Sequence, residues 1–174
     1  NRARGILISS PNVTVENCRI ESTTHAGIMI FSDTKRQARV PSNITIKNNQ
    51  FIDCGGAAIY IYAKGSTDSE LPLSGAIKNI DISNNSISYS QAPSGNSLKF
   101  RYPKSFYWQA GICAYSTDNL SIRNNNFHGF FDPEIVVNCS KNVLISGNIS
   151  DRQGKILSST EKNTGITIDN NKDM

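Results

Sequence analysis

The chain has 174 residues, of which 18 are Lys or Arg and 14 are Asp or Glu, so its formal net charge at pH 7 is +4. This mild excess is compatible with an anionic glycan but lies far below the charge of a nucleic-acid-binding protein, so we expect no nucleic-acid partner. No apolar run reaches about 18 residues, so we expect no helix that spans a membrane and no membrane partner.

One phrase recurs along the chain. It is written NVTVENC at 12–18, NITIKNN at 43–49, NIDISNN at 79–85 and NLSIRNN at 119–125, and it returns in weaker form at 142–148 and 165–171. A second apolar phrase precedes each of the first five copies: GILIS at 5–9, GIMIF at 27–31, AIYIY at 58–62, GICAY at 111–115 and EIVVN at 134–138. Both phrases alternate with period 2, which predicts strands and not helices.

A short third strand is expected after each Asn pair, because Ile20, Phe51, Ile87 and Phe127 follow those pairs. The last three copies of the first phrase start 23 residues apart, which leaves room for three short strands and tight turns only. The sequence therefore predicts an all-β fold, a right-handed parallel β-helix of about six coils with three strands each. We expect a single domain over residues 1–174 that forms part of a longer β-helix in a larger protein.

The predicted core consists of like residues stacked from coil to coil. The three inward rows are Ile6/Ile28/Ile59/Ile112/Ile135, Val13/Ile44/Ile80/Leu120/Val143/Ile166 and Val15/Ile46/Ile82/Ile122/Ile145/Ile168. A ladder of side-chain amides is predicted in the turn that follows, at Asn17, Asn48, Asn84 and Asn124.

Three insertions interrupt the repeat, at about 33–41, 64–77 and 90–109. The first two follow the apolar strand of the second and third coils, and the third precedes that strand in the fourth coil. We expect them to rise on both sides of one sheet, whose outward face would then form the floor of a groove. Because fold alone does not name a function, this groove is the predicted site.

Aromatic residues mark the outward side of that strand. Tyr60 lies in one outward column, and Phe31, Tyr62 and Tyr115 form the next. Three aromatics in a solvent-facing column would stack on sugar rings, but aromatic columns also serve to pack a β-helix beneath its loops, and both readings stay open. The third insertion holds Trp108 and Arg101, which either build a binding wall or pack within their own loop.

Carboxylates near the groove could carry glycoside hydrolysis, which needs one protonated and one ionised group about 5 Å apart for retention or about 6.5 to 9.5 Å apart for inversion. Asp33 closes the strand of the second coil, and Asp68 or Glu70 could reach it from the insertion one coil on. Each of them could also be a solvated turn residue. Lys64 stacks over Asp33 and could bind substrate or neutralise Asp33 in a structural pair.

The four cysteines fall in different columns of the repeat, so we expect free thiols in place of disulfides. The two histidines, His25 and His128, also lie in different columns, without the spacing of metal ligands, so no metal site is expected.

The stretch RGILISSPNVTVENCRIESTTHAGIMIFSD and the later NITIKNNQFIDCGGAAIYIYA resemble the parallel β-helix exo-α-1,3-galactosidases of the blood-group-B-cleaving type, over roughly residues 4–90. The resemblance implies removal of terminal α-linked galactose from glycans without a cofactor, and it puts Asp33 on the family's acidic position. Where that family has an aromatic and acidic stretch, this chain reads TKRQARVPS. A secreted or periplasmic location of the bacterial type is expected with such an activity.

Two other functions stay open. One is a non-catalytic β-helix that binds glycan or spaces other domains, and the other is a polysaccharide lyase that uses Lys or Arg as base on an acidic glycan. The expected partners are an oligosaccharide or polysaccharide and the remaining coils or domains of the parent chain. Strand edges at the two ends would also permit self-association.

Overall fold

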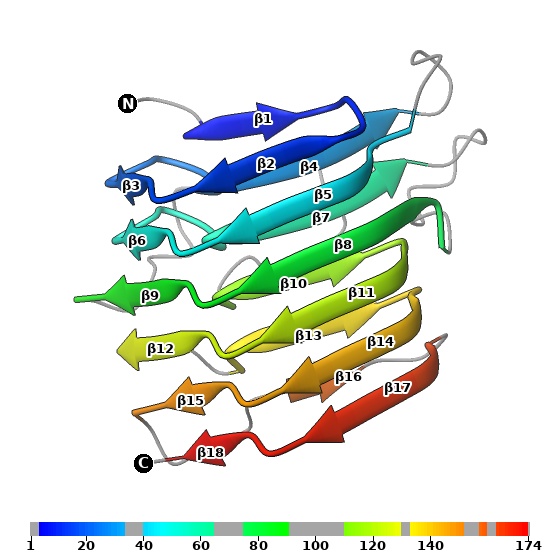
Figure 1. Ribbon diagram of the computed structural model, residues 1–174. Coiled ribbons are helices and arrows are strands. Elements are labelled where there is room, and N and C mark those ends of the chain that lie inside the picture. The colour runs from blue at the N-terminus through cyan, green and yellow to red at the C-terminus, as the bar shows by residue number, and fades with distance from the viewer. Residues whose placement is uncertain are drawn as a thin grey trace.

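The computed structural model describes residues 4–33, 40–64, 75–90, 110–129, 133–151, 157–159 and 163–173. In these ranges eighteen strands form three six-stranded parallel sheets, which we call sheets A, B and C. Each coil takes one strand from each sheet in turn, and the coils stack from the N-terminus to the C-terminus (Figure 1). The predicted parallel β-helix of about six coils is confirmed.

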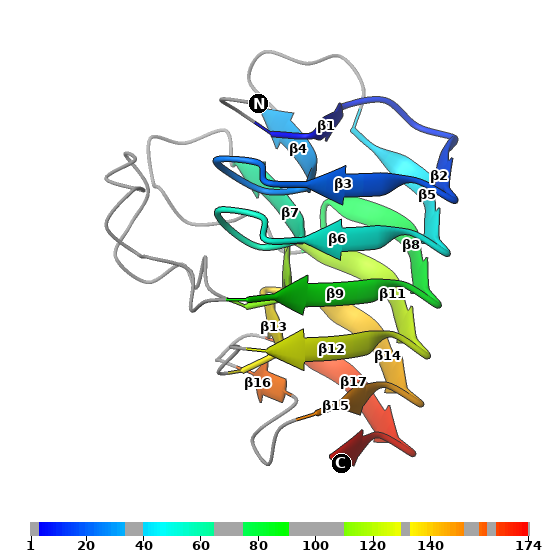
Figure 2. The same cartoon turned by 90° about the vertical axis from the view of Figure 1, so that its left-hand side faces the viewer.

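The strand bounds follow the repeat. Sheet A contains β1 (Ile6–Ile8), β4 (Ile28–Asp33), β7 (Ile59–Lys64), β10 (Ile112–Tyr115), β13 (Ile135–Asn138) and β16 (Leu157–Ser159). Sheet B contains β2 (Val13–Glu16), β5 (Ser42–Lys47), β8 (Ile77–Ser83), β11 (Thr117–Arg123), β14 (Lys141–Ser146) and β17 (Thr164–Asp169). Sheet C contains β3 (Arg19–Glu21), β6 (Gln50–Ile52), β9 (Ser86–Tyr89), β12 (Asn126–Gly129), β15 (Ile149–Ser150) and β18 (Lys172–Asp173). The short strands of sheet C run along one side of the stack (Figure 2).

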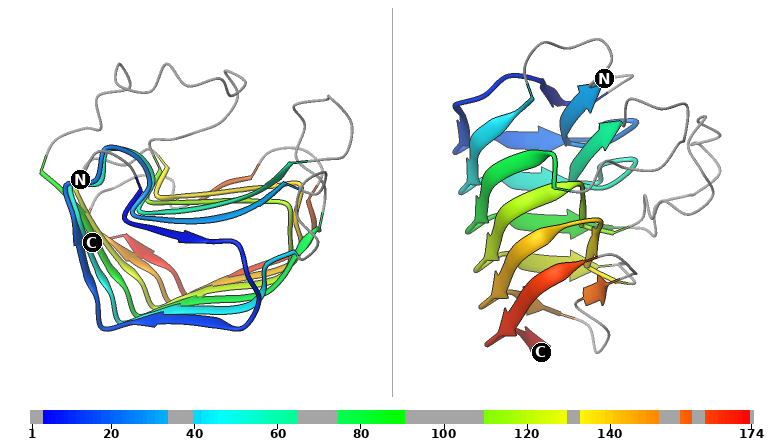
Figure 3. Two further views of the ribbon diagram at one scale, coloured as in Figure 1. Left: turned by 90° about the horizontal axis from the view of Figure 1, so that it is seen from above. Right: turned by 90° about the vertical axis from the view of Figure 1, so that its right-hand side faces the viewer.

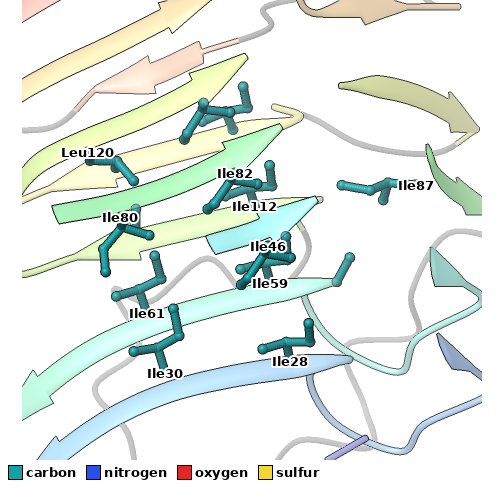
Figure 4. Packing of buried hydrophobic residues seen from close by; sticks show 14 of the residues in the cluster. Ile28, Ile30, Ile46, Ile59, Ile61, Ile80, Ile82, Ile87, Ile112 and Leu120 are labelled. Carbon is teal, nitrogen blue, oxygen red and sulfur yellow. The ribbon is translucent and has the colours of Figure 1, made fainter. Parts of the chain in front are cut away.

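The register places like on like, and all three predicted inward rows are confirmed as register partners. Seen along the stack, the three sheets enclose a common core (Figure 3). Isoleucines from sheets A and B meet there, among them Ile28, Ile59 and Ile82, all fully buried (Figure 4). Stacked β-branched side chains fill each level in the same way, because each coil repeats the pattern of the one before it.

The corner between sheets B and C depends on asparagine. The first Asn of each pair, as at Asn48 and Asn84, adopts a positive φ near 56° and 55°, which Asn tolerates better than most residues. The amide ladder, however, is formed by the second Asn of the pair. In each rung the backbone N–H and the Nδ2 of one Asn donate to the Oδ1 of the next, as from Asn49 to Asn85 at 3.0 and 3.1 Å.

The prediction of a ladder at Asn17, Asn48, Asn84 and Asn124 is therefore wrong by one residue. The left-handed turn at the first Asn directs the following side chain inward, where its amide can reach both neighbouring coils. The buried ladder, which we call the inner ladder, runs through Asn49, Asn85, Asn125, Asn148 and Asn171.

A second, exposed ladder lies at the corner between sheets A and B, where the sequence analysis predicts none. In this outer ladder the Nδ2 of Asn43 donates to Asn12, that of Asn79 to Asn43 and that of Asn119 to Asn79, at 2.8 to 2.9 Å. These residues also have positive φ. The two ladders therefore border sheet B on both of its sides.

The predicted insertions fall almost entirely outside the described residues. The strands around them are described: two insertions connect sheet A to sheet B, after β4 and after β7, and the third connects sheet C to sheet A, before β10. They therefore begin or end at both borders of sheet A, as the sequence predicts. Whether they wall a groove stays a prediction.

Candidate functional site

The predicted site lies on the outward face of sheet A, and strand alternation orients its side chains as expected. On β4 the side chains of Ile28, Ile30 and Ser32 point inward and are fully buried. Those of Phe31 and Asp33 lie on the outward side and are half-buried. The register then aligns Phe31 with Tyr62, and Asp33 with Lys64 on β7. Four outward side chains from two neighbouring strands are thereby brought together.

The prediction that the aromatic column faces solvent is wrong. Tyr60 is 0% exposed, Tyr115 1% and Tyr62 2%. They belong to a second hydrophobic cluster on the outward side of sheet A, separate from the main core. Its other buried members are Ala26, Met29, Ala57, Ala110, Cys113 and Val136. Period 2 correctly gives the direction of a side chain, but it does not say whether that face is covered.

The rings in this outer cluster pack on one another. Phe31 and Tyr62 are stacked, with centroids 6.1 Å apart and planes 17° apart, and Tyr60 and Tyr62 are stacked at 6.2 Å. Tyr115 tilts against Tyr60 at 6.1 Å. Since the three tyrosines are shielded from solvent, a sugar cannot lie on their faces in this state. The alternative reading of the column, as packing, is the one that fits their burial.

Phe31 differs from the tyrosines because it packs against the cluster but stays half-buried. Two residues further along β4, Asp33 is half-buried, and its register partner Lys64 is half-buried at the end of β7. Neighbouring strands lie about 4.8 Å apart, which keeps the two charged residues within reach of each other. We call Phe31, Asp33 and Lys64 the rim of sheet A. It combines an accessible apolar ring, a carboxylate and an ammonium group.

Several predicted site residues cannot be placed. Asp68, Glu70, Arg101 and Trp108 lie outside the described residues. It stays a prediction that Asp68 or Glu70 is the second carboxylate. The roles of Arg101 as a cationic contact and of Trp108 as an aromatic wall also stay predictions.

Two further carboxylates, those of Asp118 and Glu134, accept hydrogen bonds from other residues of the β-helix. Asp118 on β11 accepts a hydrogen bond from Asn142 at 2.8 Å, and its register partners are Lys78 and Lys141. Glu134, just before β13, is 2% exposed and accepts a hydrogen bond from the buried Ser150 at 2.7 Å. Asp118 thus bonds to the next coil, and Glu134 bonds within its own coil.

The hydrogen bond between Ser150 and Glu134 stands where other coils pack a phenylalanine ring against a glycine. In the second and fourth coils a glycine precedes the sheet A strand, and a Cβ there would lie 2.8 Å from the ring of Phe51 at Gly27 and 2.7 Å from that of Phe127 at Gly111. In the fifth coil the small and large residues exchange places, with Glu134 in the glycine position and Ser150 in the ring position. The column of Gly27, Ala58 and Gly111 before Glu134 is the sequence signal that could have found this substitution.

Two of the thiols, those of Cys54 and Cys113, are unsuited to nucleophilic chemistry. All four cysteines are free, as predicted. Burial raises the pKa of Cys113 far above its ordinary value, and burial also raises that of Cys54. Since the thiolate is the reactive form, these two thiols stay protonated and inert near neutral pH.

Within the described ranges, no three His, Cys, Asp or Glu side chains gather as a metal site would require. The Nδ1 of His128 lies 3.4 Å from the Oδ2 of Asp151, and both side chains are exposed. The described part of the chain also holds no helix of the length and apolarity needed to cross a membrane.

Comparison with known families agrees with the architecture. A family model described as "Right handed beta helix region" matches residues 1–72 and again residues 66–172. The two matches together cover almost the whole chain. No curated protein matches it. The match extends to the fold and its handedness, and it does not single out the galactosidases.

Proposed function

Because the chain belongs to the family of right-handed β-helix regions, we propose that it is a carbohydrate-active β-helix that removes terminal α-linked galactose from glycans. The rim of sheet A is its binding site. A secreted or periplasmic location accompanies this proposal, since that is where such glycans are met.

The observation that supports this proposal is the combination at the rim. Phe31 is a half-buried ring in a face where the neighbouring tyrosines are fully buried, and Asp33 follows it on the same outward side. An aromatic ring beside a carboxylate suits a sugar, whose apolar C–H face stacks on the ring while its hydroxyls bond to the carboxylate. The stack of Tyr62 and Tyr60 beneath holds the Phe31 ring in place.

In this proposal Asp33 is a catalytic carboxylate, and Asp68 or Glu70 supplies the second. One of the two protonates the glycosidic oxygen, and the other acts as nucleophile or activates a water molecule, according to their separation. Lys64 donates hydrogen bonds to sugar hydroxyls. Arg101 and Trp108 complete the site from the third insertion. Tyr60, Tyr62 and Tyr115 support the ring of Phe31 and do not contact substrate.

A second candidate is a β-helix that binds glycan without cleaving it. The observation that favours it is the register of Lys64 with Asp33, since a carboxylate and an ammonium group on adjacent strands can bond to sugar hydroxyls without any transfer of a proton. The rim would then recognise a terminal sugar only.

The test compares Asp33→Asn with Asp81→Asn, a matched change at an outward carboxylate of sheet B. Release of galactose from nitrophenyl α-galactoside and from galactose-terminated oligosaccharides would be measured. A catalytic Asp33 predicts that turnover falls by about 100-fold or more in Asp33→Asn with little change in affinity, while Asp81→Asn stays at wild-type turnover.

Binding without release of galactose in the wild type, weakened severalfold in Phe31→Ala, would favour the second candidate. Equal turnover in wild type and Asp33→Asn would remove Asp33 from the mechanism. An unchanged affinity for the galactoside in Phe31→Ala would show that the rim is not the binding site.

A further inference from the structure

Three polar side chains form a column on the outward side of sheet C. The register aligns Ser88 on β9 with His128 on β12. Asp151 comes directly after β15. The residues just before the latter two, Ser150 and Phe127, are register partners, so Asp151 lies beside His128. The three strands are neighbours on one side of the stack (Figure 2). A serine, a histidine and an aspartate from successive coils therefore lie in one line, with a strand spacing of about 4.8 Å.

The carboxylate orients the histidine. The Nδ1 of His128 lies 3.4 Å from the Oδ2 of Asp151. The backbone N–H of Gly129 donates to the two carboxylate oxygens of Asp151 at 3.1 and 3.3 Å and so fixes their position. Glycine is required there, because its φ is 104° and a Cβ would clash with the carbonyl oxygen of Tyr89. An ionised carboxylate only accepts hydrogen bonds, so it favours the tautomer with the proton on Nδ1 and leaves Nε2 as an acceptor.

The serine lies on the strand at the other side of His128, and its hydroxyl is held weakly. Ser88 is half-buried, and its Oγ donates to the carbonyl oxygen of Phe51 at 3.3 Å. An O–H···O bond usually measures about 2.5 to 3.0 Å, so the hydroxyl loses little when it turns toward Nε2 of His128. A histidine beside a serine hydroxyl can accept its proton and so activate the oxygen as a nucleophile. The column therefore has the order of a nucleophile, a base and a residue that orients the base.

An amide donor adjoins the column. Asn126 lies two residues before His128 on β12, exposed on the same outward side. Its Nδ2 can donate a hydrogen bond to the oxygen of a reacting carbonyl group, where negative charge develops. The side chains of His128 and Asp151 are 46% and 38% exposed, so the column is open to water. Such a site suits a small acyl group, such as acetyl, better than a long acyl chain that needs an apolar pocket.

We propose that Ser88, His128 and Asp151 form a second site, which hydrolyses short-chain acyl esters, with Asn126 as the oxyanion donor. The Oγ of Ser88 attacks the carbonyl carbon while its proton passes to Nε2 of His128. The C–O bond to the alcohol then breaks, and the alcohol leaves with that proton.

Water attacks the acyl–serine ester in the second half of the reaction and gives a proton to Nε2 of His128. The bond between the acyl carbon and Oγ of Ser88 breaks, Oγ takes the proton from Nε2, and the carboxylic acid leaves. Asp151 holds the imidazole and stabilises its cationic form, so it is a positioning residue.

The test measures hydrolysis of nitrophenyl acetate and covalent labelling by a fluorophosphonate, which reacts with activated serines and is located by mass spectrometry. Ser88→Ala is compared with Ser86→Ala, which removes the hydroxyl two residues earlier on the same outward side of β9. We expect turnover to fall by about 100-fold or more in Ser88→Ala and to stay at the wild-type rate in Ser86→Ala. The label should lie on Ser88. Equal turnover in wild type and Ser88→Ala, or the absence of label on Ser88, would overturn the proposal.

Two further variants test the base and its orientation. His128→Ala should lose turnover to a similar extent and regain part of it when imidazole is added. Asp151→Asn should lower kcat by about 10-fold or more, with KM and the melting temperature little changed. An unchanged kcat in Asp151→Asn would overturn its positioning role. Galactose release is measured on the same variants, and because the rim lies on sheet A and uses other residues, its outcome bears on the rim alone.

Discussion

Sheets A and B are built from the same repeat and share one core, yet their outward faces differ. Sheet A buries Tyr60, Tyr62 and Tyr115 in a second cluster, whereas sheet B leaves Leu144 37% exposed and holds its outward charges in surface pairs. Those pairs join neighbouring coils, as Lys47 to Glu16 at 3.0 Å and Arg123 to Asp81 at 2.8 Å. The predicted insertions adjoin both borders of sheet A. The comparison teaches that two faces built from the same repeat can differ in burial, so the repeat alone does not decide which face of a β-helix is covered.

The largest expected effect concerns the core that both sheets share. Ile82→Asp places a charge in a fully buried column between Ile46 and Ile122, so we expect a loss of stability above about 4 kcal/mol and an unfolded chain. Circular dichroism and thermal melting would show it. A variant with wild-type melting would contradict the inward register.

The next prediction separates the two outward faces. Tyr60→Ala removes a fully buried ring from sheet A and should cost about 3 to 5 kcal/mol of unfolding free energy. Thr45→Ala, at an outward position of sheet B, should cost within about 0.5 kcal/mol. Urea denaturation of both variants measures the difference. Similar costs for the two would show that sheet A has no second core.

The two ladders that border sheet B should also differ. Asn85→Ala leaves buried donors of Asn49 and the carbonyl of Ile46 without their partners, and we expect a cost of about 2 to 4 kcal/mol. Asn79→Gly in the exposed outer ladder keeps the positive φ and exposes its neighbours to water, so we expect a cost of about 1 kcal/mol or less. Chemical denaturation tests both, and a larger cost for Asn79→Gly would reverse the ranking.

The last prediction is a pH dependence of stability that arises at the covered face of sheet A and has no effect at neutral pH. Burial raises the pKa of Cys113 in the folded chain, while an unfolded thiol titrates near about 8.5. The unfolded state therefore loses this proton first as pH rises. The contribution of Cys113 to stability is unchanged below about pH 8 and falls by about 1.4 kcal/mol per pH unit above about pH 9.

Denaturation of wild type and Cys113→Ala at pH 8 and at pH 10.5 checks this pH dependence. The variant should lose less stability over the interval than the wild type. An identical loss in the two chains would mean that the thiol is not protected by its burial.

Much of the fold could be predicted from the sequence because a stacked repeat is read locally. The pairing of Ile28 with Ile59, or of Val143 with Ile166, follows from aligning two copies of one phrase. The predicted position of the inner ladder is wrong by one residue, because spacing alone does not tell which Asn of a pair makes the left-handed turn. The site was harder to predict. Alternation placed Phe31, Tyr62 and Asp33 on one face, but alternation does not say whether that face is covered, and Tyr62 is only 2% exposed.

The central functional claim is that the rim of sheet A holds a terminal α-linked galactose. A crystal structure of the protein soaked with an α-galactoside tests it most directly. The account predicts sugar density against the ring of Phe31, with a hydroxyl or the glycosidic oxygen within hydrogen-bonding distance of Asp33. Density on the exposed face of sheet B or sheet C, with the rim empty, would contradict it.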